Sequence, residues 1–185
     1  MLTLGQPTTF GGTVTLGSAT SIDPGNNGVI FLGPVDGSQS LTVNAGTGSV
    51  AFLSTVGATN PLQSLSVTGT TTTGAITLDR NVTTSGSQTY SDPVKVSSIA
   101  LTSQNGSIGF TSTVDGIVVD LGATSSLAIS TANGVTFGDA VGATTPLASL
   151  TVTGPTKFGA GGVSVTTNGG GQMYNGRSHC WLQLA

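Results

Sequence analysis

The sequence predicts an all-β protein folded as a parallel β-helix, a solenoid of about nine coils of about 20 residues each. Three observations carry this prediction: a composition that favours strands, an apolar motif that recurs at a near-constant spacing, and a long segment that occurs twice. An antiparallel β-sandwich also has short strands and regular turns. Its strands, however, occupy different environments and have no reason to repeat one another.

The composition favours strands over helices. Only 6% of the 185 residues are charged, and all seven acidic residues are aspartate. Glu, Lys and Arg, which normally cover the exposed faces of helices, are scarce. Thr and Val suit a pleated strand, and glycine suits the turns between strands. Hydrophobic residues make up 36% of the chain and recur in a pattern, which excludes a disordered chain.

The recurring motif is a large apolar residue followed by a β-branched residue, usually four positions later. Its first members span 164 positions in eight steps, an average of 20.5, which is the size of one β-helix coil. We expect both members to point inward and to stack as a core ladder, with a corner of the chain between them. The large members are Phe10, Phe31, Phe52, Leu78, Tyr90, Phe110, Phe137, Phe158 and Tyr174; the members that follow are Val14, Val35, Val56, Val82, Val94, Val114, Val141 and Val163.

The duplicated segment comprises residues 56–69 and 141–154, which are identical at eleven of fourteen positions with an offset of 85. An offset of this size indicates two copies of a unit of roughly 80 to 85 residues, each made of several coils. We therefore expect residues 1–176 to form a single β-helix domain with two such units, roughly 10–89 and 90–174.

The last nine residues, 177–185, depart from the pattern and hold the only His, Cys and Trp of the chain. Removing one base from codons for this segment can restore a phrase like the other repeats, which predicts an out-of-frame tail. His179 and Cys180 are neighbours in an extended segment and would point to opposite faces, so we expect no shared proton or metal there. The single cysteine, Cys180, would permit an intermolecular disulfide.

Charge and hydropathy exclude several classes of function. The net charge is −3 and no basic patch is present, so we expect no nucleic-acid partner. No apolar run approaches the roughly 20 residues needed to cross a membrane, and the first residues lack the basic start and apolar core of an export signal. No motif for a metal or another cofactor is found, so we expect none.

Several segments resemble the repeat regions of large bacterial exoproteins of the filamentous haemagglutinin type and of related giant autotransporter-like adhesins. These segments are residues 40–50, residues 81–90 and both Val-Gly-Ala-Thr-x-Pro-Leu stretches, and the resemblance extends to about residue 176. It implies a right-handed β-helical stalk. It also implies a parent protein that a Gram-negative bacterium secretes or displays on its surface, with host surfaces or glycans as candidate partners.

Two functions are weighed. The first is a non-catalytic structural or adhesive segment that associates with itself, end to end or by edge strands, because a solenoid without caps exposes core and backbone at its ends. The alternative is a glycan-binding or glycan-cleaving β-helix, which needs carboxylates converging on one face. Asp79 and Asp92, with Arg80 nearby, are its candidates. Asp36 and Asp115 lie in equivalent Val-Asp-Gly turns about four coils apart, and turn residues are the simpler interpretation of all four. We predict that the chain is not an enzyme.

Overall fold

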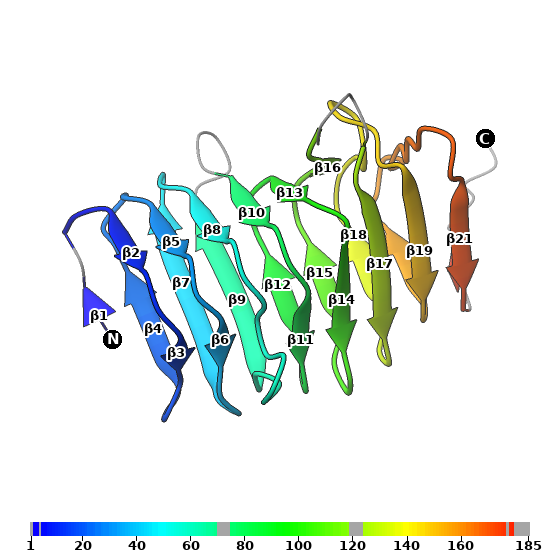
Figure 1. Cartoon of the computed structure of the whole chain (residues 1–185). Coiled ribbons are helices and arrows are strands. Elements are labelled where there is room, and N and C mark those ends of the chain that lie inside the picture. The colour runs from blue at the N-terminus through cyan, green and yellow to red at the C-terminus, as the bar shows by residue number, and fades with distance from the viewer. Residues whose placement is uncertain (1, 4, 70–74, 119–123, 177, 180–185) are drawn as a thin grey trace.

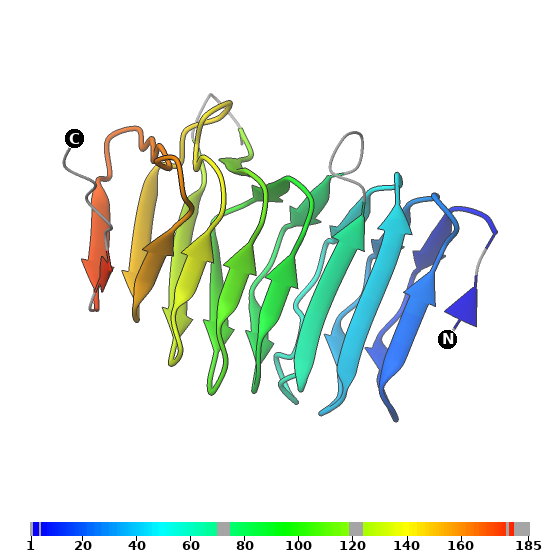
Figure 2. The same cartoon turned by 180° about the vertical axis from the view of Figure 1, so that it is seen from behind.

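The computed structural model describes residues 2–3, 5–69, 75–118, 124–176 and 178–179. These residues form 22 strands and no helix, and every strand pair among them is parallel. The strands stack along one axis, with the N-terminus at one end and the C-terminus at the other (Figures 1 and 2). The protein is therefore a β-solenoid, as the sequence predicts.

Successive strands of each coil contribute to three sheets. The nine strands of sheet A are β1 (Leu2–Thr3), β4 (Thr20–Asp23), β7 (Ser40–Gly46), β9 (Ser64–Gly69), β12 (Gln88–Tyr90), β15 (Ile108–Phe110), β18 (Val135–Phe137), β20 (Thr156–Phe158) and β22 (Ser178–His179). The six strands of sheet B are β2 (Thr8–Phe10), β5 (Val29–Phe31), β8 (Val50–Phe52), β10 (Ile76–Leu78), β13 (Val94–Val96) and β16 (Val114–Gly116). Sheet C joins β3 (Val14–Thr15) and β6 (Val35–Asp36), through bridges made by Val56, to β11 (Val82–Thr84), β14 (Ile99–Ser103), β17 (Ser126–Thr131), β19 (Ser149–Thr153) and β21 (Gln172–Asn175).

Inward residues in register form one continuous column in each sheet. The sheet A column is Leu2, Ile22, Val43, Val67, Tyr90, Phe110, Phe137 and Phe158. The sheet B column is Thr8, Val29, Val50, Ile76, Val94, Val114, Val141 and Val165. The sheet C column is Val14, Val35, Val56, Val82, Leu101, Ile129, Val152 and Tyr174.

The number of turns is smaller than the sequence predicts. Strands stack about 22 residues apart and give about seven turns, where the motif spacing predicts nine coils. The difference arises at two steps that the motif count treats as full turns, from Leu78 to Tyr90 and from Phe158 to Tyr174. The first step runs from sheet B to sheet A and the second from sheet A to sheet C, so each advances the chain by less than one turn.

The predicted core ladder is correspondingly divided among the sheets. Phe10, Phe31, Phe52 and Leu78 stack in sheet B, whereas Tyr90, Phe110, Phe137 and Phe158 stack in sheet A, and Tyr174 lies in sheet C. The β-branched members change sheet in the same way: Val14, Val35, Val56 and Val82 belong to the sheet C column, and Val94, Val114 and Val141 to the sheet B column. The next position of the sheet B column is Val165, not Val163, which is only partly buried.

Aromatic stacking between coils holds the core together. The rings of Phe10, Phe31 and Phe52 stack at centroid distances of 4.9 and 4.7 Å, close to the roughly 4.8 Å between neighbouring strands. Tyr90 and Phe110 stack at 5.3 Å in sheet A. Each fully buried aromatic side chain contributes about 1.5–3 kcal/mol by leaving water, and ring stacking adds about 0.5–1.5 kcal/mol for each pair. The described motif members of the inner coils are at most 1% exposed.

The duplicated segments adopt similar local structure on different faces of the solenoid. Val56 lies in the sheet C column, but its counterpart Val141 lies in the sheet B column. The strands that follow, β9 and β19, accordingly belong to sheets A and C. The second copy is therefore displaced by one face relative to the first. Whether the two copies behave as units of one domain, 1–176, stays a prediction.

Candidate functional site

The carboxylates of the two Val-Asp-Gly turns bind backbone rather than facing one another. Asp36 Oδ1 accepts hydrogen bonds from the amides of Thr59 and Asn60, at 3.0 and 3.3 Å, in the loop of the next coil. Asp115 Oδ1 accepts equivalent bonds from Thr144 and Thr145, at 2.9 and 3.2 Å. Each carboxylate thus holds the loop of the coil that follows it, and we call this contact of Asp36 or Asp115 the carboxylate clip.

Backbone hydrogen bonds complete this carboxylate clip in the same way in both copies. The amides of Gly57 and Gly142 donate at 2.7 Å to the carbonyls of Val35 and Val114, respectively. Both glycines have positive φ, +66° and +70°. A Cβ on Gly57 would lie 2.1 Å from a backbone oxygen of Thr83, so no other residue fits without a shift of the backbone. This loop geometry explains the glycine of the repeated Val-Gly-Ala-Thr sequence.

The other candidate carboxylates, Asp79 and Asp92, do not converge. Ile76 pairs with Val94, so β10 and β13 lie side by side. Asp92 precedes Val94 by two residues and Asp79 follows Ile76 by three, which places them five positions apart along the strands, or roughly 16 Å. The two carboxylates therefore flank opposite ends of sheet B, too far apart to act together on one glycosidic bond.

Each of these two carboxylates has its own surroundings. Asp79 forms a 3.0 Å ion pair with Arg80 and accepts a hydrogen bond from the Ser97 hydroxyl. Asp92 is only 1% exposed, and its Oδ1 has no hydrogen-bond partner. Burial raises the pKa of the Asp92 carboxyl, because desolvation disfavours its charged form. Lys95, three residues after Asp92, points outward from β13 and is exposed.

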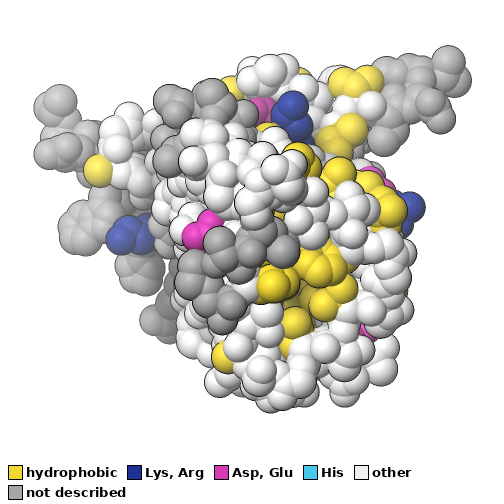
Figure 3. Space-filling view, turned by 90° about the vertical axis from the view of Figure 1, so that its left-hand side faces the viewer, with side chains coloured by type: hydrophobic (Ala, Val, Ile, Leu, Met, Phe, Trp, Pro, Cys, Tyr) yellow, Lys and Arg dark blue, Asp and Glu magenta, His cyan; other side chains and the backbone are white. Residues whose placement is uncertain are grey.

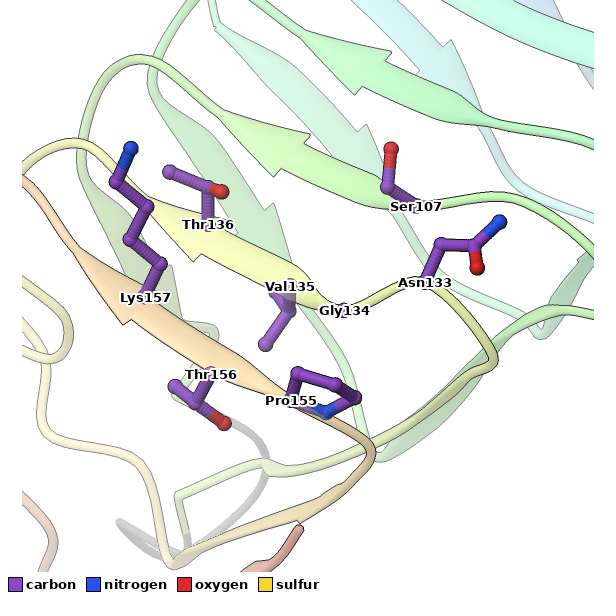
Figure 4. A pocket seen from close by; sticks show the side chains of 8 residues that line it. All are labelled: Ser107, Asn133, Gly134, Val135, Thr136, Pro155, Thr156 and Lys157. Atoms are coloured by element: carbon purple, nitrogen blue, oxygen red, sulfur yellow. The ribbon is translucent and has the colours of Figure 1, made fainter. Parts of the chain in front are cut away.

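A shallow depression on sheet A offers little chemistry. Figure 4 shows the side chains of Thr136 and Lys157 on one side of the sheet and those of Val135 and Thr156 on the other. The depression is lined by no carboxylate, and Lys157 is the charged residue of its lining. The Thr156 hydroxyl has no partner, but it belongs to the inner side of the sheet. The lining thus contains no acid–base pair.

A buried network of hydrogen bonds among Gln88, Tyr90 and Thr102, here called the polar seam, was not predicted from the sequence. The Tyr90 hydroxyl donates to Gln88 Oε1 at 2.9 Å, and Gln88 Nε2 donates to the Thr102 carbonyl at 2.8 Å. Burial raises the pKa of Tyr90. The same Gln-x-Tyr arrangement recurs near the C-terminus, where the Tyr174 hydroxyl donates to Gln172 Oε1 at 3.1 Å. The duplicated Gln-x-Tyr sequence was the signal that could have revealed this pairing.

Core residues are only partly buried at both ends of the described solenoid. Phe10 and Val14 are partly buried at the first coil, and Phe158 and Tyr174 at the last. At the N-terminal end, hydrophobic side chains gather near the centre of the end face (Figure 3). Their counterparts one coil inward, such as Phe31, are at most 1% exposed. The core side chains are therefore less buried at the two ends of the described solenoid than in its interior.

The described residues contain no cluster of three or more His, Cys, Asp or Glu side chains that could hold a metal ion. Within the same residues, no helix has the length and apolar character that spanning a membrane requires. Cys180 and most of the tail, 177 and 180–185, lie outside the described residues. The predictions of an out-of-frame tail and of a disulfide therefore stay predictions.

No protein-family model, curated protein or solved structure matches this chain. The resemblance to repeats of the filamentous haemagglutinin type therefore rests on the sequence motifs alone.

Proposed function

We propose that this chain is a non-catalytic structural segment of a bacterial surface or secreted exoprotein, and that it associates with itself. The observation that carries the proposal is the continuity of the three inward columns together with their partly buried end members. Among the described residues, the end members of the columns are less buried than the inner ones, and association would remove the apolar surface that they expose.

The environments of the aspartates favour a structural role over catalysis. Asp36 and Asp115 accept backbone hydrogen bonds, and Asp79 pairs with Arg80. Glycan cleavage by two carboxylates needs a separation of about 5–9.5 Å, which is well below the spacing of Asp79 and Asp92 along sheet B. A glycan contact by the parent protein, on a host surface or a polysaccharide, would then use outward side chains without bond cleavage.

Sedimentation velocity of the 185-residue chain over a wide concentration range tests self-association. We expect species larger than the monomer whose share grows with concentration. A strict monomer at every concentration would overturn the proposal. Incubation with acidic and neutral polysaccharides tests the absence of catalysis, since release of new reducing ends or unsaturated products would favour the glycan-cleaving alternative.

A further inference from the structure

We infer that the outer face of sheet A is an ice-binding surface, on which columns of Ser and Thr hydroxyls hold water in the arrangement of the ice lattice. The strands of this sheet lie side by side along the flank of the solenoid (Figure 2). The inference does not depend on self-association, since it concerns the side chains that point outward from one flank of a single chain.

The register between coils places the outward residues of sheet A in two columns, here called the hydroxyl array. The first column runs from coil to coil through Ser21, Thr42, Ser66, Thr89, Gly109 and Thr136. The second column lies two residues earlier on each strand and contains Ser40, Ser64, Ser87 and Ser107. The number of residues between successive members varies, so the columns follow only from the register.

The hydroxyls of the two columns have different surroundings. In the second column Ser64 Oγ donates to Ser40 Oγ at 2.8 Å, and the Oγ atoms of Ser87 and Ser107 lie 3.4 Å apart. In the first column the hydroxyls of Thr42, Ser66 and Thr89 make no hydrogen bond to any other described residue. Each of these hydroxyls can donate one hydrogen bond and accept two, so they are available to bind water.

The spacing of the hydroxyl array resembles that of ice. Neighbouring strands lie about 4.8 Å apart, and alternate residues of one strand lie about 6.6 Å apart. These two spacings are close to the two repeats of the prism face of hexagonal ice. Water bound to the hydroxyls is nearly as well held as in a direct protein contact, and the Thr methyl groups restrict the orientation of the water beside them. A sheet that fixes both spacings therefore orders a layer of water that fits the lattice.

Charge and side-chain type favour ice over other partners of this face. No member of the hydroxyl array is charged, and the first charged residue in line with it is Lys157, one coil beyond Thr136. The outer face of sheet B differs, because it carries Lys95 and the exposed Ile30. The aromatic residues at the centre of sheet A, Tyr90, Phe110 and Phe137, are buried, so they offer no exposed ring on which a sugar could stack.

Nanolitre cryoscopy of the 185-residue chain tests the inference. We expect the wild type to shape ice crystals and to hold a gap between the melting temperature and the temperature of crystal growth. Thr89→Lys places a strongly hydrated ammonium group in the hydroxyl array, and Thr136→Lys repeats the change at a second level. We expect both variants to lose the shaping and the gap.

Thr9→Lys is the matched control. Like Thr89, Thr9 is the exposed central residue of a three-residue strand, but it lies in sheet B. Far-UV circular dichroism establishes that each variant is folded, and we expect Thr9→Lys to shape ice like the wild type. An equal loss in Thr9→Lys would overturn the assignment to sheet A. A wild-type chain that neither shapes ice nor delays its growth would overturn the inference itself.

A second assay separates ice from a carbohydrate partner. Suspensions of microcrystalline cellulose and of chitin are mixed with the chain and spun down, and we expect the chain to stay in solution. Retention on either solid that Thr89→Lys abolishes, in a chain without any effect on ice, would overturn the inference in favour of a carbohydrate-binding surface. Failure of the proposed self-association is read separately by sedimentation, since a monomer can also shape ice.

Discussion

The carboxylate clip of Asp115 provides a sharp test of how the loops are held. Asp115→Ala removes the acceptor of two backbone amides, at 2.9 and 3.2 Å, from a residue that is 8% exposed. A hydrogen bond to a charged group contributes about 1.5–3 kcal/mol, but water can partly replace the acceptor because Thr144 is exposed. We therefore expect the free energy of unfolding to fall by about 2 kcal/mol in total.

The first copy of the clip supplies the matched comparison. Asp36 makes bonds of similar length but is more exposed, so Asp36→Ala should cost less, about 1 kcal/mol. The two clips lie about four coils, or roughly 19 Å, apart, so the effects should add in the double variant. Urea unfolding followed by far-UV circular dichroism measures all three. A change below about 0.5 kcal/mol for Asp115→Ala would refute the reasoning.

Three further predictions concern the seam, the loops and the buried carboxyl. Tyr90→Phe should cost about 1 kcal/mol in urea unfolding because its hydroxyl donates to a buried glutamine, and Tyr174→Phe, at the exposed copy, should cost less; equal costs would contradict this. Gly142→Ala, with φ +70°, should cost at least about 1–3 kcal/mol, whereas Gly12→Ala has open space and should stay within about 0.5 kcal/mol. Burial raises the Asp92 pKa, so wild-type stability is lost as the pH rises through that raised pKa. The gain from Asp92→Asn should therefore grow as the pH rises above the ordinary aspartate pKa of about 3.9, and a pH-independent gain would argue against it.

The sequence was sufficient to predict the fold class because its signals are local and repeated. Thr and Val favour strands, and a large apolar residue every turn indicates stacked coils. The corner between Phe10 and Val14 was also predictable, since a straight strand through the equivalent positions would bury Arg80. None of these inferences needed long-range contacts.

The face on which each motif lies was not predictable. The three sheets present similar apolar columns to the core, so Phe52 in sheet B and Tyr90 in sheet A satisfy the same pattern. An average spacing cannot distinguish a full turn from the shorter step between Leu78 and Tyr90. The partners of Asp36 were hidden for a related reason, because its hydrogen bonds reach residues more than 20 positions away. Only the register between coils reveals them.

A high-resolution structure of the chain, by crystallography or cryo-electron microscopy, tests the central claim most directly. The account predicts parallel strands about 4.8 Å apart, with Tyr90, Phe110 and Phe137 stacked in one inward column. Antiparallel pairing, or a structure in which these three rings lie on different faces, would contradict the account.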